Sequence, residues 1–113
     1  MKSYTDIEQS KKLAEFLPIE SADMNWHELS FTGFFARAFP YKLDNGATEG
    51  LFPCWSLAAL LDVLPRIEDL KPVLDLEINY IQYPSDIDLS ATADNAVDAC
   101  VEMILKLHEL KML

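Results

Sequence analysis

The stretch LDLEINYIQYPSDIDLSAT, residues 74–92, alternates apolar and polar side chains in two runs that a proline-containing segment separates. Alternation of this kind is typical of strands with one buried face, and Pro84 at the second position favours a turn over 83–86. We therefore expect a β-hairpin in which Tyr83 pairs with Asp86 and Tyr80 faces Leu89. The expected inner face carries Leu74, Leu76, Ile78, Tyr80, Leu89 and Ala91, and the outer face carries Asp75, Glu77, Asn79, Asp88, Ser90 and Thr92.

The stretch PCWSLAALLDVLP, residues 53–65, is apolar on nearly every side and has a proline at each end. Proline suits the first turn of a helix and also stops one, so we expect a three-turn helix here. This helix is either a central core element, or one whose uncovered face seals a dimer. A reactive Cys54 at its start is a third interpretation. Four leucines are expected to pack against the C-terminal helix and the hairpin: Leu57, Leu60, Leu61 and Leu64.

Further helices are expected at both ends of the chain. Thr5 and Glu8 have the spacing of a capping box, which predicts a helix that begins there and ends before Pro18. Asp94 is the expected N-cap of a C-terminal helix with a polar stripe of Asn95, Asp98, Glu102, Lys106 and Glu109. The wide apolar band of this helix predicts packing on a sheet and beside another helix.

Residues 20–45 are rich in aromatic side chains, and we expect short strands around 22–27 and 34–42. A turn signal, Asp44-Asn45-Gly46, follows them. The element order is then α-β-β-α-β-β-α in one globular domain over residues 1–113. Hairpins with helices between them indicate an α+β, two-layer fold with a mainly antiparallel sheet and helices packed on one face.

Composition excludes several classes of function. The chain has 113 residues with 19 acidic and 9 basic side chains, a net charge of −10, which disfavours direct nucleic-acid and membrane binding. No signal-peptide pattern appears in MKSYTDIEQSKK, so the expected compartment is the cytoplasm, where Cys54 and Cys100 stay reduced. We expect both thiols to be buried and unpaired.

Motifs for catalysis and for ligands are not found. There is no G-x-G-x-x-G, no P-loop, no H-E-x-x-H and no EF-hand spacing, and two distant cysteines do not make a zinc site. Pairing of Cys54 with His27 or His108 is the one nucleophile–base arrangement that the sequence leaves open. We therefore expect no enzyme, no cofactor and no metal.

Three stretches together resemble short uncharacterised proteins of gut Bacteroides, often encoded in prophage-like or mobile regions: LPIESADM (17–24), PCWSLAALLDVLP (53–65) and ADNAVDACVEMILKLHELK (93–111). The resemblance brings no known activity. It implies a small intracellular accessory protein of a mobile element.

Two function classes follow for such a protein. The first is a protein-binding or structural module without catalysis, which binds a protein partner or forms a homodimer. The alternative is an acidic decoy that blocks the nucleic-acid site of a basic partner, because residues 72–105 hold seven acids and no Lys or Arg. The candidate interaction surface comprises Trp26, Phe31, Phe34, Phe35, Asp75, Glu77 and Asp88.

Overall fold

The computed structural model describes residues 2–29, 33–38, 51–84 and 88–113, with the backbone alone at 27–29, 33–38 and 51. Its elements, in chain order, are α1 (Ile7–Ala14), the 3-10 turn η1 (Ile19–Ser21), β1 (Met24–Leu29), β2 (Gly33–Ala38), β3 (Leu51–Cys54), α2 (Leu57–Val63), β4 (Val73–Asp75), β5 (Tyr80–Gln82), β6 (Ser90–Thr92) and α3 (Ala96–Glu109).

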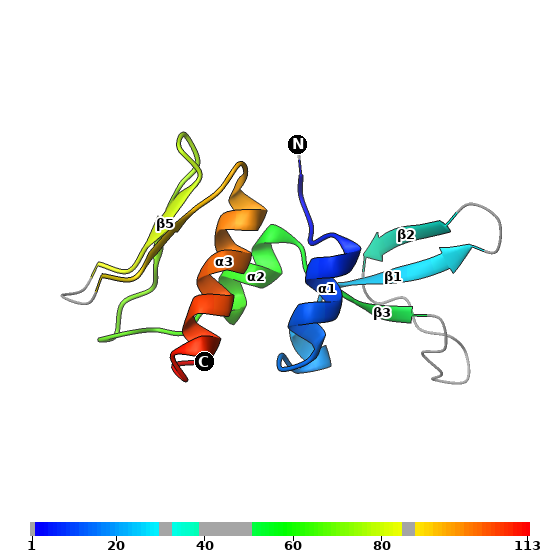
Figure 1. Ribbon diagram of the computed structural model, residues 1–113, viewed down its shortest axis with the longest axis horizontal. Coiled ribbons are helices and arrows are strands. Elements are labelled where there is room, and N and C mark those ends of the chain that lie inside the picture. Colours follow the sequence, from blue (N-terminus) through cyan, green and yellow to red (C-terminus); the bar gives the residue numbers. More distant parts are fainter. Residues whose placement is uncertain (1, 30–32, 39–50, 85–87) are drawn as a thin grey trace.

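The predicted α+β class is confirmed, and every strand pair described is antiparallel. The strands form two sheets, with orders β2-β1-β3 and β4-β5-β6, where we expected one sheet with helices on one face. Each predicted β-β unit has gained a third strand. The helices lie in the middle of an elongated molecule of 48 × 26 × 21 Å, with one sheet toward each end (Figure 1).

The strand β3 is the main surprise of the first sheet. It contains Pro53, which we had expected to open a helix, and pairs Pro53 with Asn25 of β1. The prediction was wrong because β3 lies at the edge of its sheet, where a residue without an N–H is tolerated. The other two strands confirm the expected pair around 22–27 and 34–42, although the second prediction extends into 39–42, outside the described residues.

Helix α2 is consequently shorter than predicted. It begins at Leu57, where the Ser56 hydroxyl accepts a hydrogen bond of 3.2 Å from the N–H of Ala59. It ends at Val63, and Leu64 is already extended before Pro65, as the restriction on pre-proline residues requires. Leu60 and Leu64 are fully buried. The interpretation of α2 as a core helix is therefore the one that the structure supports.

Both predicted N-caps are wrong by one residue. Asp6, not Thr5, caps α1 and forms a capping box with Gln9, and Asn95, not Asp94, caps α3. For α1, a tertiary contact determines which of the adjacent residues Thr5 and Asp6 is the N-cap. The Thr5 hydroxyl is fully buried and accepts a hydrogen bond from the N–H of Trp55, so it is already engaged.

The hairpin of residues 74–92 has two turns where we expected one. Residues 76–79 form a turn between β4 and β5, and the β5–β6 pairing sets Ile81 opposite Ala91 and Tyr80 opposite Thr92. The predicted pairing of Tyr80 with Leu89 is therefore off by three residues, an odd number that exchanges the two faces of β5. Ile81 is fully buried, whereas Leu76 and Ile78 are exposed.

The core lies between the second sheet and the helices α2 and α3, and Leu13 of α1 also belongs to it. Leu74, Ile81 and Ala91 form one row across the sheet, and α3 packs against β5 and β6 while α2 packs beside α3. This agrees with the expected position of the C-terminal helix. The side chains of the core that are buried completely, or to within 2% for Leu89, include Leu60, Leu64, Tyr83, Leu89, Cys100, Met103, Ile104 and Leu107.

Candidate functional site

The aromatic part of the predicted interaction surface is not a surface where the structure describes it. Trp26 is 9% exposed, its Nε1 donates to Ser10 Oγ at 3.1 Å, and its ring meets Tyr4 edge-on at 5.7 Å. The assignment of Trp26 to an interaction surface was wrong, because the side chain joins β1 to α1. Phe31 lies outside the described residues. Phe34 and Phe35 lie on β2, where the backbone alone is described.

The acidic part of the predicted surface does face solvent. Asp75, Glu77 and Asp88 are all exposed, as the alternation predicted. The Oδ1 atom of Asp75 accepts a hydrogen bond of 3.0 Å from the N–H of Glu77, which begins the turn after β4. Neither Asp75 nor Glu77 forms an ion pair within the described part of the chain. These carboxylates are consequently available to cations or to a basic partner.

Large apolar side chains accompany these acids, contrary to expectation. Val73 is 62% exposed, Leu76 66% and Ile78 61%. We call residues 73–78 the hairpin surface. Leu76 and Ile78 were predicted to face inward in a continuous strand, but the chain turns at 76–79 and carries both into solvent. A signal for this turn was present in the sequence, because Asp75 and Asn79 both favour turns and Asn79 adopts φ 51°.

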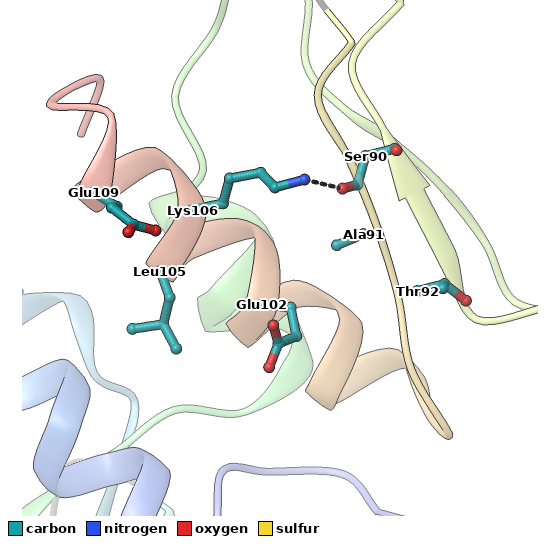
Figure 2. Close-up of a pocket in the computed structure, with 7 residues that line it drawn as sticks. All are labelled: Ser90, Ala91, Thr92, Glu102, Leu105, Lys106 and Glu109. Atoms are coloured by element: carbon teal, nitrogen blue, oxygen red, sulfur yellow. Dashed lines mark hydrogen bonds between the residues drawn. The ribbon is translucent and has the colours of Figure 1, made fainter.

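A groove lies between β6 and α3, at the edge of the second sheet (Figure 2). We call it the β6–α3 groove; its volume is about 250 Å³, and it is lined by Ser90, Ala91, Thr92, Glu102, Leu105, Lys106 and Glu109. Lys106 extends from α3 to the strand, and its Nζ donates a hydrogen bond of 2.9 Å to the backbone oxygen of Ser90. The predicted polar stripe of this helix includes Glu102, Lys106 and Glu109, and Leu105 belongs to its predicted apolar band, but the position of these residues beside β6 was not predicted.

The environment of Cys54 does not favour a reactive thiol. Cys54 is fully buried on β3, and its Sγ lies 3.7 Å from the hydroxyl and 3.5 Å from the carbonyl oxygen of Thr5. Burial raises the pKa of the Cys54 thiol, so the thiolate is disfavoured near neutral pH. His108, one of the bases considered for it, is exposed and stacks on Phe16 at 3.8 Å instead.

The expected burial of both cysteines is confirmed, and neither forms a disulfide. Cys54 reaches this position on a strand and not on the predicted helix, whereas Cys100 lies inside α3 as expected. Among the described residues, no three His, Cys, Asp or Glu side chains gather closely enough to hold a metal ion. None of the helices in the described ranges has the length and apolarity needed to cross a membrane.

No protein-family model, no curated protein and no solved structure matches this chain. In the described part of the chain, the second sheet carries two candidate contact sites, the hairpin surface and the β6–α3 groove.

Proposed function

We propose that this protein is a small protein-binding module without catalysis, and that the hairpin surface is its principal contact. The observation that carries the proposal is the exposure of Val73, Leu76 and Ile78, each above 60%, on one short hairpin. Clustered large apolar side chains on a surface mark contact sites more often than isolated ones do. Burial of such side chains against a partner would supply the hydrophobic contribution to binding.

The chemistry of the partner follows from the acids between these side chains. Asp75 and Glu77 alternate with the apolar residues, and both are exposed. Interfaces combine an apolar centre with a polar rim, so the fitting partner has an apolar depression bordered by Lys or Arg. A second copy of the chain fits less well, because it would bring these carboxylates against one another. The resemblance to short proteins of mobile regions supports a role as a cytoplasmic accessory protein.

The test is affinity capture with the full chain as bait, in the cytoplasm of its own host. Leu76→Ser with Ile78→Ser should abolish capture of the partner while the melting temperature stays unchanged, because both side chains are exposed. The matched control is Ile19→Ser with Leu110→Ser, which removes two other apolar side chains of 52% and 53% exposure. Retention of the partner by the hairpin variant, or equal loss in the control, would contradict the proposal.

The alternative proposal is an acidic decoy for the nucleic-acid site of a basic protein. Its support is the exposure of Asp75, Glu77 and Asp88 in a region without Lys or Arg. Replacing these three with Asn, Gln and Asn should then abolish capture, and binding should weaken steeply with salt. If the decoy is correct, the serine variant retains the partner and the amide variant loses it. We expect the reverse: the serine variant loses the partner, and the amide variant weakens capture without abolishing it, because exposed ion pairs at a rim contribute little.

A further inference from the structure

The outer edge of β6 has backbone groups that no neighbouring strand uses in the described part of the chain. The N–H of Tyr83 donates to the carbonyl of Leu89 at 2.9 Å, and the N–H of Ala93 donates to the carbonyl of Asn79 at 3.3 Å. Because hydrogen-bonding directions alternate along a strand, residues 89, 91 and 93 face β5. The backbone groups of Ser90 and Thr92 therefore point away from β5, toward the open side of the sheet.

The contact of Lys106 confirms this direction for Ser90. Its Nζ reaches the Ser90 carbonyl oxygen from α3, across the β6–α3 groove (Figure 2). A lysine over a strand edge is a common device against unwanted pairing between sheets. Here the lysine is exposed and holds one carbonyl. A ligand with its own backbone donor can therefore displace it.

The charge of the groove indicates which ligand fits. Glu102 and Glu109 line it from α3, both exposed, and Asp88 and Asp94 lie at exposed positions on either side of β6 along the chain. Lys106 is the single base among the lining residues, and it is directed at the strand. Ala91 and Leu105 add apolar lining. This is a strand edge with acidic surroundings and some apolar surface.

We propose that the β6–α3 groove binds an extended, basic segment of a partner protein, which adds to the second sheet as a strand beside β6. The segment forms backbone hydrogen bonds with Ser90 and Thr92, and its Lys or Arg side chains meet Glu102 and Glu109. Strand addition of this kind obtains affinity from the main chain and specificity from alternate side chains. The proposal goes beyond the hairpin surface, because none of the groove residues belongs to 73–78.

A second copy of this chain is a poorer occupant. Pairing two copies through β6 would bring Glu102 and Glu109 of each near those of the other, between molecules that each carry a net charge of −10. Like charges facing one another across an interface disfavour the complex. A basic segment reverses the sign of this interaction.

The first test uses a seven-residue peptide of alternating valine and lysine, with blocked ends, titrated into the isotopically labelled full chain. We expect the amide signals of Ser90 and Thr92 to shift, together with those of α3 around Glu102. Two N-methylated peptides identify strand pairing: methylation of one alternate set of amides should abolish binding, and methylation of the other should preserve it. This holds because only one edge of an added strand faces β6.

Charge variants provide the second test. Glu102→Gln with Glu109→Gln should weaken binding of the peptide about two- to ten-fold, as expected for the loss of exposed ion pairs. Asp75→Asn with Glu77→Gln changes the net charge equally, at the other side of the sheet, and should leave binding unchanged. Lys106→Met should strengthen binding, because it frees the Ser90 carbonyl and removes a positive charge.

Three results would overturn the proposal. The first is that the amide signals of Ser90 and Thr92 do not shift up to about millimolar peptide, the concentration range of the weakest specific contacts. The second is equal binding of both methylated peptides, and the third is equal weakening of binding by the two charge variants. These results are independent of the capture experiment on the hairpin surface. That experiment can fail while the peptide binds at β6, and the reverse outcome is equally distinguishable.

Discussion

Cys54 and Cys100 have the same chemical state although they lie on different kinds of element. Both are fully buried. Burial raises the pKa of each thiol, and for Cys100 it raises the pKa to about 11. We therefore predict that neither thiol reacts with a polar disulfide reagent in the native protein and that both react in denaturant.

The reagent's absorbance measures this directly, and Cys54→Ala and Cys100→Ala assign any slow phase to one residue. Cys54→Ala should fold and lose roughly 1 kcal/mol of stability, as is usual for removal of a small buried group. Rapid reaction of one thiol in the native state would contradict its burial. If that thiol is Cys54, the result would support the interpretation of Cys54 as a reactive centre.

Tyr83 links the second sheet to the segment after α2. Its side chain is fully buried, and its hydroxyl donates a hydrogen bond of 2.6 Å to the carbonyl oxygen of Pro65. Burial raises the pKa of Tyr83 to about 12 from 10.0. The native state therefore holds the phenol proton more tightly than the unfolded chain does. The stabilisation is complete below the unfolded pKa, near 10, and is lost as the pH rises toward 12.

Tyr83→Phe should accordingly lower the free energy of unfolding near neutral pH by about 1 kcal/mol, because it removes a hydrogen bond. The variant should lose less stability than the parent protein between about pH 10 and pH 12. Urea denaturation at several pH values measures both effects, and Tyr80→Phe, at a half-buried position, is the control. A parallel alkaline decline in parent and Tyr83→Phe would contradict the assignment.

At the scale of elements, a matched pair of leucines distinguishes the core from the hairpin surface. Leu60 in α2 is fully buried, whereas Leu76 in the β4–β5 turn is 66% exposed. Leu60→Ala should cost about 2–5 kcal/mol, because it leaves a cavity among α2 and α3. Leu76→Ala should cost below about 0.5 kcal/mol. Chemical denaturation measures both values.

Equal losses in the two variants would contradict the described hairpin, because they would place Leu76 in the core. A loss below about 1 kcal/mol for Leu60→Ala would instead show that α2 is an exposed helix, and would favour the interpretation of α2 as a dimer seal.

Sequence periodicity predicted the kinds of elements well, because burial of one face imposes a pattern on each. The class, the hairpin region, the two terminal helices and the stop at Pro65 were all predictable in this way. The exposure of Asp75 and Glu77 also followed from alternation. The acidic residues of the candidate surface were therefore predictable, whereas the exposed Leu76 and Ile78 beside them were not.

Register and element ends depended on contacts that periodicity does not contain. The alternation in LDLEINYI is compatible with one continuous strand and also with a strand, a turn and a second strand. The turn that forms requires the backbone of Asn79 to adopt φ 51°. Pro53 fits a helix start or an edge strand, and only pairing with β1 decides between them. The β6–α3 groove could not be predicted, since it requires the distance between Lys106 and Ser90.

At the scale of the whole molecule, polar contacts between the N-terminal segment and the helices link the two sheets. Lys2 Nζ lies 2.7 Å from Asp98 of α3 and 3.1 Å from Asp6, the N-cap of α1, while Gln9 of α1 donates to Asp98 at 2.8 Å. Trp55, fully buried, follows β3 directly and donates its Nε1 proton to Ser21. These contacts couple the first sheet to the helices that cover the second. We therefore expect both sheets to unfold together.

The association state follows from the same arrangement. Leu60 of α2 and Leu64, which follows the helix, are fully buried within one chain and need no second copy to cover them. Each chain also carries a net charge of −10, which opposes self-association at low salt. We predict a monomer in sedimentation and a single thermal transition whose midpoint does not depend on protein concentration.

A midpoint that rises with concentration would show that the folded state is linked to association. In that case, loss of the concentration dependence in Leu76→Ser with Ile78→Ser would assign the contact to the hairpin surface, and a second copy would replace the basic partner as its occupant.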